Sequence, residues 1–563
     1  MPTRPATDFD AIVIGSGVTG GWAAKELCES GLKVLMIERG RMVEHIHDYP
    51  TERTPPWQVP YRGLGDPVAA KEDFPSFVGR SAISEWNQHF FASERDHPYQ
   101  TPPERPFVWY RGYQLGGKSL VWGRMCYRWS EMDFEANARD GAGVDWPIRY
   151  DDLRPWYDRV ETFVGVSGSR ENLPQLPDGP FQPPMALNHV EKAFKAKTEE
   201  AFPGRKVIIG RVANLTEDLE GRTRCQYRDN CSRGCSFGAY FSTQSATLPA
   251  ARKTGNLTLL VDTRVVGLEF DAALNRVTGV RTTDKGGKGH GRYTSRLVFL
   301  CASTLNSVQI LLQSASAAFP NGLGNSSGVL GRYLMDHAQG GVTSLIPGYL
   351  DRGYFGSRPT TFYIPRFRNL SEPSPGFVRG YGIQGKAFRA NWQQRLSLPG
   401  VGSALKARLR SPGAWVLSLG PFAECLPRSS NRVTLDHKHL DPQGQPQLSI
   451  DFTWGENEKR LVADGVEECD RMAKAFGGVT LSKEATPAPP GGAAHEMGGA
   501  RMGRDPRSSV LNAVNQAHDV PNLFVTDGAS MSSSACQNPS LTYMALTARA
   551  CAAAVSMLRE GRV

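Results

Sequence analysis

Apolar and polar positions are most regular near the N-terminus, between residues 10 and 38. Residues 11–14 form a short apolar run, residues 22–27 have the composition of a helix, and residues 34–37 form a second apolar run. Short continuous apolar runs are typical of parallel strands that are buried on both faces. The pattern therefore predicts a strand, a helix and a second strand, the repeating unit of a doubly wound sheet.

The turn between the first strand and the helix carries Gly15, Gly17 and Gly20 in the spacing G-x-G-x-x-G. Gly15 permits a tight turn, Gly17 lets the backbone approach a pyrophosphate, and Gly20 lets helix and strand pack closely. The phosphates would lie at the helix N-terminus, where N–H groups and the helix dipole favour an anion. Glu38 ends the second strand, where a carboxylate can accept hydrogen bonds from a ribose. We interpret this stretch as a site for a dinucleotide, either FAD or NAD.

Buried-strand texture returns in residues 205–345, for example in the apolar run at 297–302 that opens into a helix. The C-terminal range adds a further strand and an Ala-rich helix. We therefore predict that residues 1–41, 205–345 and 490–563 together form one nucleotide-binding domain. The predicted fold class is α/β, with this Rossmann-like domain assembled from three separate pieces of the chain.

Between residues 346 and 489 the pattern changes to alternating, aromatic-rich stretches. Alternation predicts a mainly antiparallel sheet, and we assign this range to an interleaved substrate-binding domain. Residues 42–106 are rich in Pro, Asp, His and aromatic residues without a sustained period, which predicts a lid or partner-docking loop region. Residues 107–204 are interpreted as a connecting segment, in which Gly116 and Gly117 would let the backbone lie flat beside a planar ring system.

Composition narrows the classes of function. With 40% hydrophobic and 21% charged residues, the 563-residue chain is typical of a soluble globular protein. Its net charge of +9 comes from scattered Lys and Arg residues, so nothing favours a nucleic-acid partner. No apolar run reaches the roughly 18 residues of a transmembrane segment. Because Met1–Asp8 has neither an apolar signal region nor a twin arginine, we expect the chain to be cytoplasmic or exported with a partner that carries the signal.

Four motifs, in chain order, resemble those of the glucose-methanol-choline (GMC) flavin oxidoreductases. They are the glycine-rich turn with Glu38, Gly116-Gly117-x-Ser119, His495-x-x-Gly498, and Asp527-Gly528 followed by Asn538-Pro539-x-Leu541-Thr542. The resemblance spans nearly the whole chain and implies FAD rather than NAD. It implies non-covalent FAD, since residues 119–122 lack the histidine that some family sugar oxidases bond to flavin. The FAD contacts implied are Gly15, Gly17, Gly20, Glu38, Arg39, Gly116, Gly117, Ser119, Val265, Asp527, Gly528, Asn538, Pro539 and Thr542.

The resemblance also implies that His495 and Asn538 face the flavin ring and the carbinol of a bound alcohol. Oxidising an alcohol requires removal of the hydroxyl proton while a hydride leaves carbon, and an imidazole with a pKa of about 6.5 suits that proton transfer. Asn538 can hold the same oxygen by a hydrogen bond. A lone histidine is more often a satisfied interior residue, but its place in a glycine-rich turn after a linker favours catalysis. For Asp336 and His337 we predict a structural role, although they could line the pocket.

Cys225, Cys231 and Cys235 are clustered, whereas the other seven cysteines are dispersed. A disulfide would leave one thiol unpaired, and a zinc site prefers four ligands, yet no histidine occurs between His189 and His290. Three thiolates on one loop suit an iron–sulfur cluster with three protein-bound irons. The spacing resembles that of bacterial sugar and gluconate dehydrogenases of the GMC family that hold a [3Fe-4S] cluster, although a distant fourth ligand remains an alternative.

A cluster beside a flavin would carry electrons away singly, so we expect a dehydrogenase with a cytochrome or quinone acceptor. The chain resembles most the catalytic subunits of bacterial glucoside 3-dehydrogenases, which implies oxidation of a sugar or glucoside at C3. It also implies a small subunit with an export signal, a cytochrome c acceptor, and a periplasmic or membrane-associated location reached through that subunit. The alternatives are a gluconate, glucose or polyol dehydrogenase, an oxidase that uses O2, and a non-catalytic flavin-binding subunit.

Overall fold

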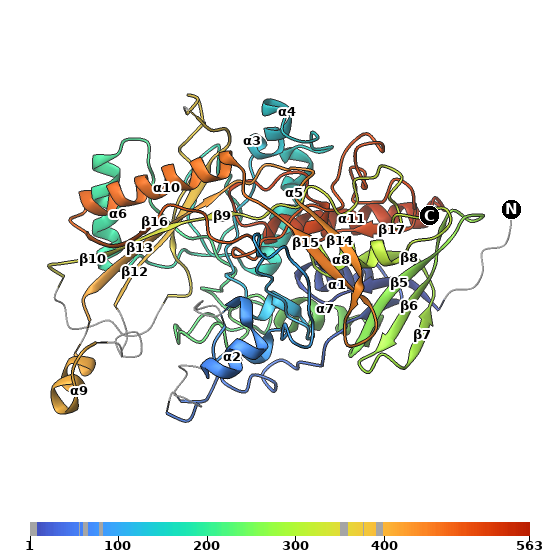
Figure 1. Cartoon of the computed structure of the whole chain (residues 1–563), viewed down its shortest axis with the longest axis horizontal. Helices are drawn as coiled ribbons and strands as arrows, with labels where there is room; N and C mark the ends of the chain where they lie inside the picture. Colours follow the sequence, from blue (N-terminus) through green and yellow to red (C-terminus); the bar gives the residue numbers. More distant parts are fainter. Residues whose placement is uncertain are drawn as a thin grey trace.

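Two large sheets lie side by side in this protein, a parallel sheet on the right of Figure 1 and an antiparallel sheet on its left. The structure is a computed structural model that describes residues 8–55, 57–59, 66–77, 83–349, 358–374, 376–389, 398–411 and 413–563. Outside the described residues lie parts of the predicted lid (56, 60–65 and 78–82) and of the predicted substrate domain (350–357, 375, 390–397 and 412).

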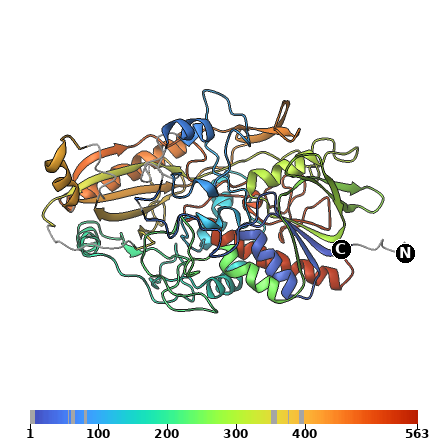
Figure 2. The ribbon, with the colours of Figure 1, turned by 90° about the horizontal axis from the view of Figure 1, so that it is seen from below.

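The parallel sheet has five strands in the order β17-β8-β1-β2-β4. Its central strand pairs Ala11 with Val34 of β2 and Ile12 with Val298 of β8. Helices α1, α7 and α11 lie together on one face of this sheet (Figure 2). The bounds are β1 Phe9–Ile14, β2 Val34–Ile37, β4 Leu257–Leu260, β8 Ser295–Leu300, β17 Leu523–Val525, α1 Val18–Glu29, α7 Leu248–Lys253 and α11 Ser540–Arg559.

The antiparallel sheet runs in the order β16-β10-β13-β12-β11-β3, and β9 also pairs with β13. Strand β13 shows the expected alternation, with Trp415, Leu417 and Leu419 buried in the core that includes α10, and Val416 and Ser418 half-buried. The bounds are β3 Ile208–Ile209, β9 Ala338–Gln339, β10 Gly341–Ile346, β11 Phe362–Ile364, β12 Tyr381–Arg389, β13 Trp415–Ala423, β16 Val479–Glu484, α6 His189–Ala201 and α10 Glu456–Ala475.

Some strands belong to a different sheet from the one predicted. Strand β3 and all of β10 except Ile346 fall within residues 205–345, yet β3 pairs with β11, and β10 pairs with β13 and β16. Conversely, the hairpin of β14 (Arg432–Leu440) and β15 (Pro446–Asp451) packs Val433 and Ile450 into the core that contains α8 (Thr304–Gln313). The composition of a short strand indicates burial but does not specify its partner, which is set by contacts distant in sequence.

A third, three-stranded antiparallel sheet is formed by β5, β6 and β7. The bounds of the remaining helices and strands are α2 Pro67–Asp73, α3 Glu131–Phe134, α4 Ala136–Asp140, α5 Tyr150–Val164, α8 Thr304–Gln313, α9 Gly402–Arg410, β5 Thr263–Asp271, β6 Arg276–Asp284 and β7 His290–Tyr293.

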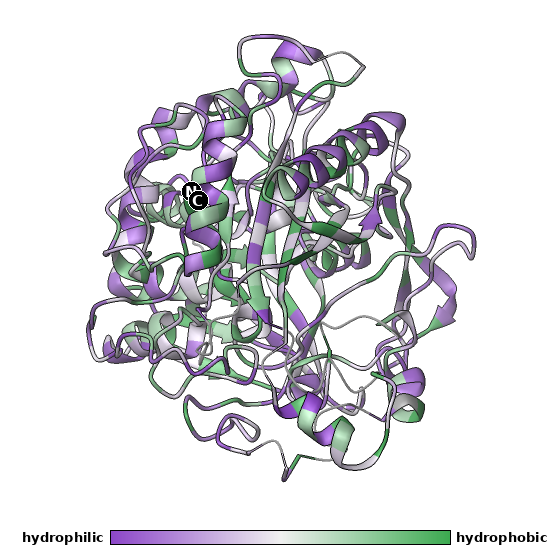
Figure 3. Ribbon diagram, turned by 90° about the vertical axis from the view of Figure 1, so that its left-hand side faces the viewer, coloured by the Kyte–Doolittle hydropathy of each residue, from purple (hydrophilic) through white to green (hydrophobic). Residues whose placement is uncertain are grey.

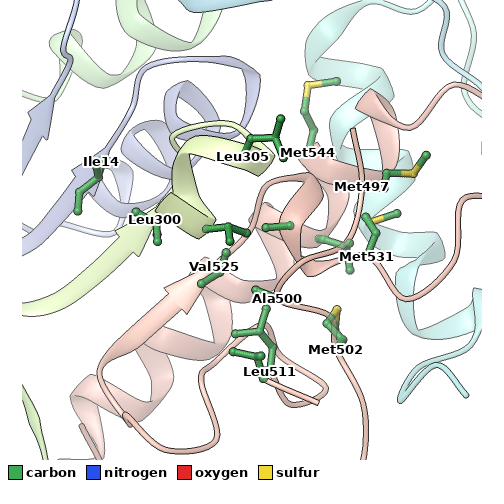
Figure 4. Close-up of a cluster of buried hydrophobic side chains, with 14 of the residues drawn as sticks. Ile14, Leu300, Leu305, Met497, Ala500, Met502, Leu511, Val525, Met531 and Met544 are labelled. Atoms are coloured by element: carbon green, nitrogen blue, oxygen red, sulfur yellow. The ribbon is translucent and has the colours of Figure 1, made fainter. Parts of the chain in front are cut away.

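The core begins where the parallel strands end. Ile14, Leu300 and Val525, at the ends of three neighbouring strands, meet methionines such as Met497 and Met531 from the C-terminal loops (Figure 4). Figure 3 shows the hydrophobic residues concentrated in the central strands, with mostly hydrophilic outer helices. By length and composition α11 could cross a membrane, but 67% of its apolar window is buried within the protein. It packs against α1 and α5, so we interpret it as a core helix.

Candidate active site

Two glycine-rich turns meet at the carboxyl end of β1. Gly15 has a φ of 94°, a value that favours glycine, and an added Cβ on Gly20 would lie 1.9 Å from the Gly15 carbonyl oxygen. No atom lies within 4 Å of the Cβ position of Gly17, whereas that of Gly117 lies 3.7 Å from the Cα of Gly17. The backbone amide of Gly116 donates to Ser16 Oγ at 2.8 Å and ties the turns together. Backbone is therefore open at Gly17 for the close approach of a ligand.

Glu38 lies beneath the first turn and is almost fully buried. Its Oε2 accepts hydrogen bonds from the amide and hydroxyl of Ser16, at 3.1 and 2.5 Å, and its Oε1 accepts one from the Gly40 amide at 2.9 Å. Burial raises the pKa of Glu38 against the lowering effect of these donors. The carboxylate both fixes the turn and lines the adjoining cavity.

One elongated cavity joins this turn to the C-terminal motifs, since Glu38 and His495 both line it. The predicted cofactor residues that line it are Gly15, Gly17, Glu38, Arg39, Gly117, Ser119, Val265, Asp527, Gly528, Asn538 and Pro539. Gly20, Gly116 and Thr542 do not. Gly20 packs on Gly15, Gly116 contacts Gln244, and the Thr542 hydroxyl lies 2.8 Å from the phenol oxygen of Tyr157. These three residues support their motifs through packing. Only residues on the side of a motif that faces the cavity line it.

The chemistry of the lining fits FAD. Open backbone at Gly17 suits a pyrophosphate at the start of α1, and Glu38 suits a ribose. Asp527, which also lines the cavity, accepts from the Ala529 amide at 3.0 Å and from the Ser307 hydroxyl at 2.5 Å. Burial raises the pKa of Asp527 to about 6. The cavity thus offers polar groups along its whole length, as an extended dinucleotide requires.

A chain of hydrogen bonds determines the protonation of His495. The carbonyl oxygen of Ala535 can only accept, so His337, at 3.0 Å, carries its proton on Nε2. The Nδ1 of a neutral His337 then accepts, and His495 Nδ1, 2.8 Å away, donates. This leaves His495 Nε2 as a lone pair, 3.2 Å from Asn538 Nδ2. Asn538 Oδ1 in turn accepts from Gln384 Nε2 at 2.7 Å.

Burial, followed by the nearby His337 and Lys118, holds the pKa of His495 well below its ordinary value of 6.5. The imidazole is therefore neutral at neutral pH, which a proton acceptor requires. Its backbone amide donates to Asp336 Oδ1 at 3.1 Å, and burial together with Glu496 raises the pKa of Asp336 to about 7. The predicted structural role of Asp336 and His337 thus takes a specific form, namely that they orient His495.

Sequence reasoning missed two polar residues of the site, Lys118 and Gln384. Lys118 lines the cavity and donates to Glu496 Oε2 at 2.9 Å. Lys118 is the variable residue of the Gly116-Gly117-x-Ser119 motif, so that motif could have identified it as a site residue. Gln384 lies on β12, in a strand whose sequence gives no sign of catalysis. Its contact with Asn538 becomes visible only when the two sheets are brought together.

The cysteine loop, residues 224–240, lies outside the cavity but within range of the charge of Arg124, which lines it. Burial, and then the Cys231 and Cys235 thiolates, raise the pKa of Cys225 to about 11 against the Tyr227 amide. The loop is held by Glu52, whose Oε1 accepts from the Ser236 amide at 2.8 Å and from Arg228. Within the described ranges, no three His, Cys, Asp or Glu side chains are gathered as metal ligands.

Comparisons with known proteins agree with this arrangement. Residues 9–339 match the N-terminal family model described as GMC oxidoreductase, and residues 427–547 match the C-terminal one. The 2-methyl-1,2-propanediol dehydrogenase of Mycolicibacterium austroafricanum is 28% identical, with 97% of this chain and 95% of that protein covered. The fructose dehydrogenase large subunit of Gluconobacter japonicus is 27% identical, with 98% of each covered.

Two further relatives extend the comparison. The paromamine 6'-oxidase of Streptomyces fradiae is 28% identical, with 95% of this chain and 89% of that protein covered. The crystal structure of a pyridoxine 4-oxidase from Mesorbium loti has a TM-score of 0.60 at 18% identity and covers 97% of this chain and 98% of that one. At that identity, the structural likeness establishes the fold.

Proposed function

Because this chain belongs to the GMC oxidoreductase family, we propose that it is an FAD-dependent dehydrogenase that oxidises a secondary hydroxyl group of a sugar or glucoside at C3. The observation that carries the reaction type is the lone pair of His495 Nε2 beside Asn538, in a cavity shared with the dinucleotide turn. Support for the substrate class comes from relatives named for fructose and for paromamine. The choice of C3 rests on the resemblance of the sequence motifs.

FAD, held by the glycine-rich turns and Glu38, would supply the acceptor for the hydride that leaves the carbinol carbon. His495 takes the hydroxyl proton at Nε2, where the substrate hydroxyl replaces Asn538 Nδ2 as the donor. Asn538 then holds the substrate oxygen through its amide group, while Gln384 fixes the other end of that amide. His337 keeps the proton of His495 on Nδ1, so that Nε2 stays available. Lys118 places a positive charge in the same cavity, which favours the build-up of negative charge there.

We further propose that Cys225, Cys231 and Cys235 are ligands of a [3Fe-4S] cluster, which would supply a single-electron route to a cytochrome c or quinone acceptor. The thiols lie on one loop near Arg124, which also lines the cavity. They are not gathered as ligands in this structure, so the loop would have to close around the metal. The proton transfer at His495 does not depend on this step. A small partner subunit with an export signal, and a periplasmic location, belong to the same proposal, supported by one relative that is named a large subunit.

The decisive experiment is anaerobic titration with methyl glucoside. Flavin absorbance should bleach in proportion to substrate, and NMR of the product should show a carbonyl at C3. A product oxidised at C1 or C2 would defeat the C3 assignment, and absence of bleaching by any sugar would defeat the sugar class. Rapid peroxide formation in air would favour an oxidase, the class to which the Streptomyces fradiae relative belongs by name.

A separate measurement tests the cluster. Protein purified without air should contain about three irons per flavin, as a three-thiolate site implies. Cys231→Ser should lose this iron and slow the reduction of single-electron acceptors, while substrate still bleaches the flavin. The matched control is Cys28→Ser, at a buried cysteine on α1, which should keep the iron. Iron-free wild-type protein with full activity would refute the cluster.

A further inference from the structure

A long stretch of the chain carries basic residues without any acid. Between Glu372 and Glu424 there is no Asp or Glu, whereas the whole chain has 56 acidic against 65 basic residues. The basic residues in this stretch are Arg379, Lys386, Arg389, Arg395, Lys406, Arg408 and Arg410. Arg379 is buried against Asp140, but the last three lie on α9. The local excess of positive charge is therefore concentrated on one small helix.

Helix α9 is an outlier in its packing. None of its residues is buried, and it projects from the substrate side of the molecule, at the opposite end from both termini (Figure 1). Val401, just before the helix, is 86% exposed, the highest value among the large hydrophobic residues of the described chain. Leu405 follows one turn later, and Lys406 and Arg410 are likewise one turn apart and exposed. Apolar and basic side chains thus form two adjacent stripes.

The other outer helices are balanced differently. On α6, Lys195 pairs with Glu199 and Lys197 with Glu200, and on α10 Lys459 pairs with Glu456. Such ion pairs are typical of a solvent-exposed helix face. Helix α9 has no acidic residue to form them. A short helix that carries basic side chains and no acidic ones, beside the exposed Val401 and the half-buried Leu405, has instead the composition of a helix that lies on an anionic lipid surface.

We propose that α9, together with Val401, docks this protein on the surface of an anionic lipid bilayer. Lys406 and Arg410 would meet lipid phosphates, while Val401 and Leu405 would enter the headgroup layer. A lipid surface fits better than a specific acidic protein, because the apolar stripe is shallow and the charge is spread along the helix without a shaped cleft. The contact would be reversible, since two apolar side chains bury little area.

The test is flotation of the FAD-loaded protein with vesicles of phosphatidylcholine and phosphatidylglycerol in equal parts, compared with pure phosphatidylcholine vesicles. Binding should require phosphatidylglycerol and should weaken at high salt, because the Debye length shortens to about 3 Å at 1 M. The double variant K406Q/R410Q should bind about 25-fold more weakly, since each charge near such a surface contributes about fivefold. Val401→Ser should weaken binding by a smaller factor.

The matched control is K285Q/K288Q, which removes the same charge from the β6–β7 turn, far from α9 (Figure 1). It should bind like wild type, and retained flavin absorbance should show that every variant is folded. Failure of wild-type protein to float with phosphatidylglycerol vesicles at low salt would overturn the proposal and would favour an acidic protein partner. Equal losses in the α9 variant and in the control would also overturn it, because net charge alone would then explain binding.

Discussion

The His495 pocket and the cysteine loop both lie within range of Arg124, yet they are held in different ways. His495 receives contacts from the adjacent residues Asp336 and His337 and, from a second segment, from Asn538. The cysteine loop has Tyr227 and Asp229 at positive φ and half-buried thiols. The proton-transfer geometry is thus complete in the polypeptide itself. The thiols of the cysteine loop would reach a ligand arrangement only when metal binds, as is common for metal sites in proteins.

The largest effect should come from removing the base. We expect His495→Ala to slow substrate-driven flavin reduction by about 10²–10⁴-fold, the usual contribution of a positioned general base. Anaerobic stopped-flow absorbance measures this rate directly. FAD content should stay near one per chain, because the glycine-rich turns that would hold the dinucleotide do not contact this side chain. Near-normal flavin reduction would show that His495 is not the proton acceptor.

His337 tests whether the organisation, rather than His495 alone, matters. His337→Leu removes the acceptor for His495 Nδ1–H, so both tautomers of His495 become accessible and reduction should slow by about 10- to 100-fold. His337→Asn keeps an acceptor oxygen close to the same place and should recover most of the rate. The KM should change little in either variant, since His337 does not line the cavity. Equal rates for the Leu and Asn variants would contradict the orienting role.

The parts of the fold and the site that depend on residues close in sequence could be predicted from sequence motifs. The strand–turn–helix at β1 and α1, Glu38, and the C-terminal Asp527 all depend on residues close in sequence, and each was located from its motif. The motif containing His495 was found in the same way. Asn538 was predicted together with His495, whereas the contact of His495 with His337, 158 positions away, and that of Asn538 with Gln384, 154 positions away, were not, because residues so distant in sequence leave no local signal. The assignment of β3 failed for the same reason, since its partner β11 is brought to it only by the folded sheet.

The direction of a pKa shift distinguishes buried carboxylates that burial destabilises from those that hydrogen bonds stabilise. Burial and Glu496 raise the pKa of Asp336 to about 7, whereas an unfolded aspartate has a pKa of about 3.9. The folded state therefore binds more protons between these values, and stability falls as pH rises from about 4 to 7. Asp336→Asn removes this penalty, so its stability relative to wild type should increase across that range. Urea denaturation at several pH values measures the trend.

Asp470 provides the opposite control. Burial acts against its ionisation, but hydrogen bonds from Lys474, Thr480 and Lys483 outweigh it and lower the pKa of Asp470 to about 2. Its contribution to stability is present above about pH 4 and is lost as pH falls through 2. Asp470→Asn should therefore lose stability relative to wild type as pH rises from 2 to 4. Parallel trends for the two variants would mean that Asp336 is not strained in the folded pocket.

The smallest expected effect concerns the other region, where Glu52 secures the cysteine loop. Its carboxylate accepts from Arg228, from the Ser236 amide at 2.8 Å and from the Ser236 hydroxyl at 3.0 Å. Glu52→Gln weakens these charge-assisted bonds, which should cost about 1–3 kcal/mol locally. Hydrogen exchange of residues 224–240 should then quicken. Flavin reduction by substrate should not change, because the His495 contacts come from other segments.

Glu456→Gln is the matched control, since that exposed carboxylate pairs with Lys459 on α10 and a solvent-exposed ion pair contributes little to stability. If Glu52→Gln slowed flavin reduction as much as it loosened the loop, the two regions would form one cooperative unit. If it loosened the loop alone, the pocket and the loop would be independently held. In that case a closing of the thiols around metal could occur without disturbing the geometry at His495.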